Sequence, residues 1–224
     1  DALRQALSAA MVRQGSQIAL QRLDDVLQPL AHTDEQRTGL LVLRVEALLN
    51  LGRLADALAP AEEAERLAPP NSALHADAVA LLGSTLALSG QAATAAQRLQ
   101  LAVTAAQRLG DPAREAVALG ALAHARFADG QWGAAVEAQQ RAVVLAHRRG
   151  DPTEIAAVTA NLATLVAYVG DAVLACQSAL DAEQRFANLH AEGNQRLYNR
   201  IILARCAAHQ GWLGQAWQTL APVA

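Results

Sequence analysis

Residues 110–152 read GDPAREAVALGALAHARFADGQWGAAVEAQQRAVVLAHRRGDP and contain one complete structural repeat. Each end carries Gly-Asp-Pro, in which glycine ends one helix, aspartate caps the next and proline occupies its first turn. Gly130 divides the stretch into two segments with helical periodicity. We therefore expect a helix to about Asp129, a turn at Gly130 and a second helix to about Arg149. Glu154, three residues after Asp151, predicts a capping box.

Glycines continue this spacing through the whole chain at intervals of 37 to 41 residues. A fixed period of this length is typical of a repeat array. It predicts an all-α solenoid of about six antiparallel helix pairs, with residues 1–224 as a single solenoid. The glycines are Gly15, Gly52, Gly90, Gly130, Gly170 and Gly211.

Two apolar series follow the glycines and predict the packing. A leucine eight residues before the glycine marks the buried face of each first helix, and an alanine five residues after it lets the second helix approach closely. The leucines are Leu82, Leu122, Leu162 and Leu203. The alanines are Ala57, Ala95, Ala135, Ala175 and Ala216.

The composition narrows the class of protein. Hydrophobic residues make up 53% of the 224 residues and aromatic residues only 3%. Arg, Gln, Glu or Gly interrupts every long apolar run, so we expect a soluble protein without a membrane span. A net charge of −3 argues against a nucleic-acid-binding surface. All 18 basic residues are arginine, which excludes P-loop and Schiff-base lysine chemistry.

The first residue, the composition and the cysteines suggest where the chain comes from and where it is located in the cell. The chain begins at Asp1, so we expect a fragment of a longer protein, and an alanine-rich composition without lysine suggests a bacterial source. Cys176 and Cys206 lack the spacing of a disulfide framework or a zinc site. We expect reduced, mostly buried thiols and a cytoplasmic location.

No pattern in the sequence combines the groups that catalysis needs. Ser84 and Thr85 lack a neighbouring base and a nucleophile elbow, so helix interior is the better interpretation. The histidines have no His/Cys or His/Glu partner at metal-ligand spacing, which predicts no metal site. We expect no catalytic residue and no cofactor. The histidines are His32, His75, His124, His147, His190 and His209.

The leucine, glycine and alanine series, together with Pro69, resemble the tetratricopeptide-repeat (TPR) family. The best single match is Asn161-Leu162-Ala163 followed by Gly170 and Ala175. The long repeat is similar to those of kinesin light chain and Pins-type scaffolds, and to sensor arms of bacterial regulators. The resemblance implies a right-handed superhelix whose first helices line a concave groove for a peptide or protein, without catalytic chemistry.

The chain also departs from two binding modes of the family. Val42 and Glu46 occupy positions where the clamp for chaperone C-terminal carboxylates needs hydrogen-bond donors. Asn161 is the only asparagine at its repeat position, so the asparagine ladder of some long-repeat scaffolds is missing. An Hsp90-type adaptor is therefore not expected.

The family pattern predicts a partner-binding groove of mixed charge with aromatic side chains. On the helix near Tyr198 and Asn199, three arginines, Arg196, Arg200 and Arg205, could meet an acidic segment or a phosphate, but ordinary solvated arginines are the better interpretation. The predicted groove residues are Glu46, Asn50, Ser84, His124, Phe127, Thr164, Tyr168, Tyr198, Arg200, Arg205 and His209.

The three tryptophans receive two interpretations. Trp132 lies where the family braces the helix turn, which predicts a core residue. Trp212, Trp217 and Leu220 belong to a final helix without a polar cap, which terminal repeats normally need. We expect them to contact other domains of the parent protein or a symmetric copy of the chain.

These observations favour a noncatalytic protein- or peptide-binding scaffold, as part of a larger bacterial signalling or transcriptional regulator. Its partner would be a protein or peptide, without direct nucleic-acid or membrane binding. The alternative is a sensor of a small ligand or peptide pheromone that uses groove residues such as His124, Phe127 and Tyr168. An enzyme with a site between helices is a third, weaker hypothesis.

Overall fold

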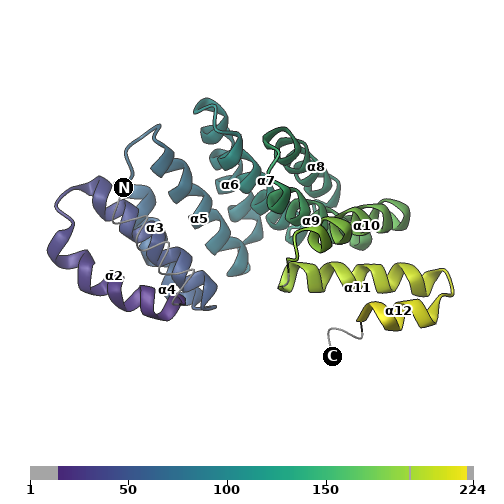
Figure 1. The fold of residues 1–224 in the computed structure, drawn as a ribbon. Coiled ribbons are helices and arrows are strands. Elements are labelled where there is room, and N and C mark those ends of the chain that lie inside the picture. The colour runs from purple at the N-terminus through teal and green to yellow at the C-terminus, as the bar shows by residue number, and fades with distance from the viewer. Residues whose placement is uncertain (1–14, 192, 221–224) are drawn as a thin grey trace. The chain divides into compact units, whose positions relative to one another are not determined.

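The computed structural model describes residues 15–191 and 193–220, and all regular structure in these ranges is helical (Figure 1). The prediction of an all-α chain is confirmed. The expected first helix of the first pair and the end of the chain after Leu220 lie outside the described residues. The helices are α2 (Ser16–Leu30), α3 (Asp34–Asn50), α4 (Leu54–Leu67), α5 (Ala73–Leu88), α6 (Ala92–Arg108), α7 (Pro112–Ala128), α8 (Trp132–Arg149), α9 (Pro152–Val169), α10 (Ala172–Asn188), α11 (Asn194–His209) and α12 (Leu213–Leu220).

The helices form two compact units, which are described separately. The N-terminal unit, Asp1–Asp129, contains α2 to α7, and the C-terminal unit, Gly130–Ala224, contains α8 to α12. In the first unit α4 contacts α3 and α5, α6 contacts α5 and α7, and α5 also contacts α3 and α7. In the second unit α9 contacts α8, α10 and α11, while α12 packs on α11. The continuity of a single solenoid across Gly130 stays a prediction.

The predicted glycine punctuation is confirmed in the backbone. All six repeat glycines have φ between +69° and +97°. At Gly170, with φ of +97°, the chain turns between α9 and α10, and its N–H donates to the Val166 carbonyl. Gly150 ends α8 in the left-handed conformation, with φ of +76°. A side chain at either position would strain the backbone.

The Gly-Asp-Pro caps form as expected, with one difference. Asp111 Oδ1 accepts hydrogen bonds from the N–H groups of Ala113 and Arg114, each at 3.0 Å. Asp151 accepts from Thr153 and Glu154 in the same way. The capping-box prediction for Glu154 is wrong, because its carboxylate instead accepts a hydrogen bond from the Arg149 guanidinium. A capping box does form at the start of α3, between Thr33 and Gln36.

The predicted core series is largely buried. Four of the five alanines have at most 2% of their surface exposed, whereas Ala216 in α12 is half-buried. Leu82, Leu122 and Leu162 are buried, and Leu203 is half-buried against a core cluster. Small side chains on second helices and leucines on first helices therefore build both cores, as the spacing predicts.

The α9 helix is the described segment that has the length and apolar composition of a membrane span. Its mean hydropathy of 1.2 is only just high enough for a membrane span, and 44% of the segment is buried among the packed helices. Its neighbours are α8, α10 and α11 of the same unit. These contacts identify α9 as the core helix of the C-terminal unit.

Gly83 on α5 lies in close contact with α6. A Cβ atom added there would lie 2.6 Å from Leu99 Cγ and 3.3 Å from the Leu99 backbone nitrogen. Leu99 is fully buried, so its side chain has little room to move. This position requires glycine for space rather than for backbone conformation.

We expect Gly83→Ala and Gly39→Ala to change stability in opposite directions. Gly83→Ala should lower the free energy of unfolding by about 1–3 kcal/mol, because overpacking outweighs the gain in helix propensity. Gly39 lies inside α3 with open space around its Cα, so Gly39→Ala should raise the free energy of unfolding by about 0.5–1 kcal/mol. Urea unfolding followed by circular dichroism measures both, and a stabilised Gly83→Ala protein would contradict the packing assignment.

An ion-pair cluster ties α7 to α5 in the same unit. The Arg114 guanidinium donates to Asp77 on α5 at 2.8 Å and also pairs with Asp111 at the start of its own helix. The Arg114 N–H and guanidinium together lower the pKa of the Asp111 carboxyl below its ordinary value of 3.8. The two carboxylates in turn raise the pKa of Arg114. The charged form of Asp111 is therefore favoured by the fold.

The lowered pKa of Asp111 predicts an acid-dependent loss of stability. Its contribution is present above pH 3.8, the ordinary pKa, and is lost as the pH falls through the lower folded pKa. The stability difference between the wild type and Asp111→Asn should therefore be largest above pH 4 and shrink at lower pH. Urea midpoints measured from about pH 2 to 7 test this. A difference that does not change with pH would contradict it.

Candidate functional site

An apolar groove opens in the C-terminal unit between the end of α9, the first half of α10 and the last half of α11. Its volume is about 590 Å³, which lies in the usual range for ligand sites. We call it the α10–α11 groove. The lining residues are Ala167, Gly170, Ala172, Val173, Ala175, Cys176, Gln177, Leu180, Ile202, Arg205, Cys206, His209 and Gln210.

Two exposed aliphatic side chains on α10 form one wall of the groove. Val173 is 69% exposed and Leu180 is 62% exposed. Below them, Ala175 and Ile202 belong to the buried core of the unit. The groove therefore offers apolar surface that is not covered within the described part of the chain, on top of a packed base.

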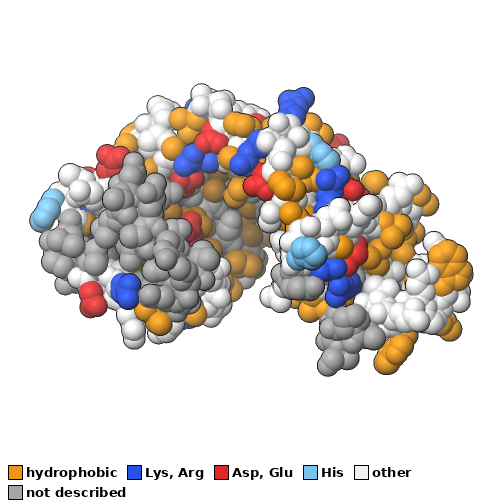
Figure 2. Space-filling model, in the orientation of Figure 1, with side chains coloured by type: hydrophobic (Ala, Val, Ile, Leu, Met, Phe, Trp, Pro, Cys, Tyr) orange, Lys and Arg blue, Asp and Glu red, His pale blue; other side chains and the backbone are white. Residues whose placement is uncertain are grey.

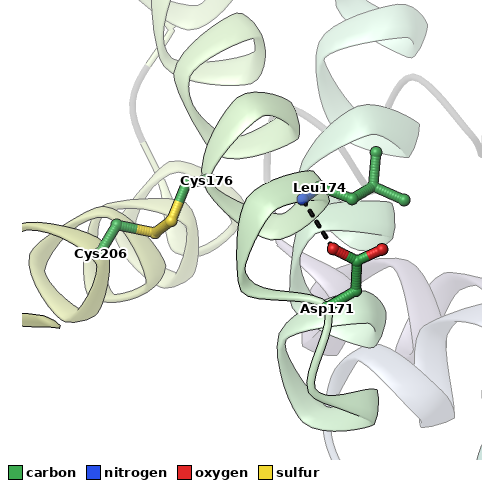
Figure 3. Close-up of a disulfide and its surroundings, with 4 residues drawn as sticks. All are labelled: Asp171, Leu174, Cys176 and Cys206. Carbon is green, nitrogen blue, oxygen red and sulfur yellow. Dashed lines mark hydrogen bonds between the residues drawn. A yellow bond between two sulfur atoms is a disulfide. The ribbon is translucent and has the colours of Figure 1, made fainter.

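A disulfide joins Cys176 on α10 to Cys206 on α11, and both residues line the groove (Figure 3). The two Cα atoms lie 5.8 Å apart although the residues are 30 positions apart in sequence. The prediction of reduced thiols is wrong, and the cytoplasmic location loses the argument that rested on it. Local cysteine spacing does not reveal this pair, because packing of α10 against α11 brings together residues that are distant in sequence.

Two basic side chains line the groove. Arg205 and His209 are the only ionisable groups among the lining residues, and neither an aspartate nor a glutamate lines it. No carboxylate in the described ranges pairs with Arg205. Both residues were predicted from their repeat position, and the structure places them together in the groove.

The other two arginines of α11 have a structural role. Arg196 and Arg200 share the Glu183 carboxylate on α10, at 2.9 Å and 3.2 Å. Asn199 between them is fully buried and donates its amide N–H to the Ala179 carbonyl at 2.9 Å. The hypotheses of a free basic patch and of ordinary solvated arginines are therefore wrong for Arg196 and Arg200. These contacts hold α11 against α10.

The remaining predicted groove residues lie on several helices of the two units. Tyr168 on α9 and Tyr198 on α11 are exposed, and Thr164 donates to the Ala160 carbonyl of its own helix. The N-terminal unit carries Glu46 and Asn50 on α3, Ser84 on α5, and His124 and Phe127 on α7. Their role in binding stays a prediction.

Two residues of the N-terminal unit refine that prediction. Val42 is 1% exposed and belongs to a core cluster, so it is not available to a groove. His124 reaches the surface, yet desolvation by the surrounding protein lowers the pKa of its imidazole. The neutral ring is therefore favoured at His124.

A second cavity, which the sequence analysis missed, lies in the N-terminal unit. It has a volume of about 450 Å³ and is formed by α5, α6 and the end of α4. Its walls carry His75, Thr104 and Arg108, and its Glu65 carboxylate accepts a hydrogen bond from Arg98 at 2.8 Å. The cavity is more polar than the α10–α11 groove, and its chemistry matches no simple ligand class.

The structure agrees with the predictions for the tryptophans only in part. Trp132 is 55% exposed at the start of α8, so its assignment to the core is wrong. Trp212 and Trp217 are exposed and Leu220 is half-buried. Figure 2 shows hydrophobic and uncharged surface over α12. An interface at this end stays a prediction.

Within the described residues, no group of three His, Cys, Asp or Glu side chains could hold a metal ion. Both cysteines in these ranges are joined in the disulfide, so no free thiol is present there. The chemistry of the groove is therefore that of apolar contact, two basic groups and one disulfide.

Reduction of the disulfide should destabilise the C-terminal unit. Chain entropy predicts a loss of about 3–4 kcal/mol for a closed loop of roughly 30 residues. We expect dithiothreitol to lower the unfolding midpoint of the wild type, measured by circular dichroism. A Cys176→Ala, Cys206→Ala double variant should show the low midpoint with or without the reductant. Equal midpoints for the oxidised and reduced wild type would contradict this.

Comparison with known proteins identifies the fold. No family model matches the chain, and no curated protein is similar to it in sequence. The chain is similar to the solved structure of Rap protein complexed with Competence and Sporulation Factor, with a TM-score of 0.76 at 12% identity, over 97% of this chain and 66% of that one. It is also similar to BtubC (BKLC) from P. vanneervenii, with a TM-score of 0.73 at 16% identity, over 97% and 89% of the two chains.

A third similar structure is the Signal Transduction ATPase with Numerous Domains (STAND) protein PH0952 from Pyrococcus horikoshii, which has a tetratricopeptide repeat sensor. The TM-score is 0.71 at 13% identity, over 96% of this chain and 36% of that one. Identities this low establish the fold rather than a shared activity. The chain has the fold of the TPR-like α-solenoids.

Proposed function

We propose that the chain is a noncatalytic scaffold that binds a peptide or protein segment in the α10–α11 groove. One observation carries the proposal, namely that this groove combines uncovered aliphatic side chains with basic groups on a packed base. Apolar pockets with a few polar groups are typical of peptide recognition, in which buried side chains give affinity and polar contacts give orientation.

The groove suits a short segment better than a large flat surface. Val173 and Leu180 lie seven residues apart on α10, so they lie on the same face of the helix, two turns apart. Two aliphatic side chains at this spacing can contact two apolar residues of a bound segment. Arg205 and His209 on α11 supply donors on the opposite side.

Similarity of fold supports a place in a larger bacterial signalling or transcriptional regulator. The matched STAND protein carries its tetratricopeptide repeats as a sensor, and this chain covers only 36% of it. The matched Rap protein was solved in complex with a factor. We infer an analogous sensor role, in which a bound segment is sensed by repeats that belong to a longer chain.

A sensor of a small ligand is the second candidate function. The volume of about 590 Å³ lies within the range of small-molecule sites, and the groove is largely apolar. This hypothesis uses the same wall residues as peptide binding. The two differ in the length of ligand that the protein selects.

A peptide-library experiment tests the proposed groove. The purified chain is incubated with phage-displayed random dodecapeptides, and the affinities of selected synthetic peptides are measured by fluorescence anisotropy. Val173→Asp should weaken binding about tenfold or more, because it removes a contact worth about 1.5 kcal/mol and places a charge in an apolar wall. Selection of no peptide, together with binding of small apolar compounds, would favour the small-ligand sensor.

Val117→Asp is the matched control. Val117 on α7 of the N-terminal unit is 68% exposed, nearly the same as Val173, and does not line the groove. It should leave the peptide affinity unchanged. Loss of binding in Val117→Asp and not in Val173→Asp would move the binding surface to the N-terminal unit.

A further inference from the structure

The disulfide lies in the wall of the α10–α11 groove rather than in the core beneath it. Cys176 and Cys206 are both half-buried and both line the groove, whereas the neighbouring Ala175 and Ala179 are at most 2% exposed. A ligand in the groove therefore lies against the two residues of the disulfide. A disulfide that serves only to staple two helices does not require this exposure.

The charges around the disulfide favour thiolates. Arg205 directly precedes Cys206 and lines the same groove, and its guanidinium is a permanent positive charge. No acidic side chain lines the groove from α9, α10 or α11. Nearby positive charge stabilises a thiolate, so it favours both the approach of an entering thiolate and the departure of a leaving one.

The contact between α10 and α11 does not depend on the disulfide alone. Asn199 on α11 donates to the Ala179 carbonyl on α10, and Glu183 on α10 holds two arginines of α11. The α11 helix also packs on α9. Opening the disulfide therefore removes one of several connections and leaves the walls of the groove in place.

We propose that Cys176–Cys206 is a thiol-exchange site that captures a thiol-bearing ligand covalently. This inference rests on the proposed function, because the ligand enters through the same groove. The ligand thiol loses its proton to solvent, and its thiolate attacks Sγ of Cys176. The S–S bond breaks, and its electron pair stays on Sγ of Cys206, the residue that follows Arg205 in α11. The product is a mixed disulfide at Cys176, and the Cys206 thiolate releases the ligand by the reverse attack without net oxidation or reduction.

Glutathione serves as the first probe on the intact chain. The reaction is stopped with acid, and peptide mapping by mass spectrometry locates the adduct. We expect the adduct on Cys176. Arg205→Gln should slow its formation severalfold, because it removes the positive charge of the residue next to Cys206. Arg148→Gln is the matched control, because Arg148 is exposed on α8 and does not line the groove.

The sign of the probe's charge separates electrostatics from a structural effect. Glutathione is anionic and cysteamine is cationic. After correction for the pKa of each thiol, the wild type should therefore react faster with glutathione. Salt at 1 M should reduce this difference in rate. Arg205→Gln should reduce it as well, with an unchanged circular dichroism spectrum. An adduct on Cys206, no adduct, or equal rates in wild type and Arg205→Gln would overturn the proposal.

A peptide pool identifies the source of the thiol. Octapeptides with one cysteine between apolar residues compete with glutathione at equal thiol concentration. In the wild type, more peptide than glutathione should be attached to Cys176, and Val173→Asp should abolish this preference. Excess glutathione adduct on Cys176 would instead assign the site to small thiols. Library peptides in which cysteine is replaced by serine distinguish the two proposals, because they should bind the wild type without forming an adduct. Binding of the cysteine peptides without any adduct would overturn thiol exchange alone, whereas failure of both kinds of peptide to bind would overturn the proposed function.

Discussion

Close approach of paired helices is the constraint on which this structure depends. The chain has few aromatic residues, so its core consists of leucines set against alanine or glycine on the facing helix. Gly83 against Leu99 is the extreme case, since even one added carbon would lie 2.6 Å from the leucine. Such a core gains stability from many short contacts. Each repeat must therefore keep its small residues in register with the glycine of its turn.

The same constraint explains why the candidate site lies where it does. Regular packing fixes the buried positions and leaves the exposed positions of each helix free to differ. In the C-terminal unit those positions carry Val173 and Leu180 on α10, and Arg205 and His209 on α11. On the far half of the same interface, Glu183 and Asn199 close the contact between the two helices. One end of the interface is thus held by polar bonds and the other remains open.

The sequence predicted the elements well because the repeat is encoded locally. Gly170 and the Asp111 cap each depend on neighbours within a few residues, and their geometry follows from residue type. Arg205 and His209 line the α10–α11 groove, and their role in binding stays a prediction. The disulfide was missed because it joins residues 30 positions apart through helix packing. Trp132 was misplaced because a family position does not specify which neighbour covers it.

The partial exposure of the disulfide and the basic residues near it distinguish it from a purely structural crosslink. A crosslink beneath the surface would add stability and nothing more, because no reagent could reach its sulfur atoms. Cys176 and Cys206 instead share a wall with uncovered aliphatic side chains, and the only ionisable neighbours in that wall are basic. Since Glu183 and Asn199 hold the two helices independently, the sulfur–sulfur bond is the connection that the unit can open without losing its groove. The disulfide adds stability by restricting the unfolded chain, while Glu183 and Asn199 keep α11 against α10 when it opens.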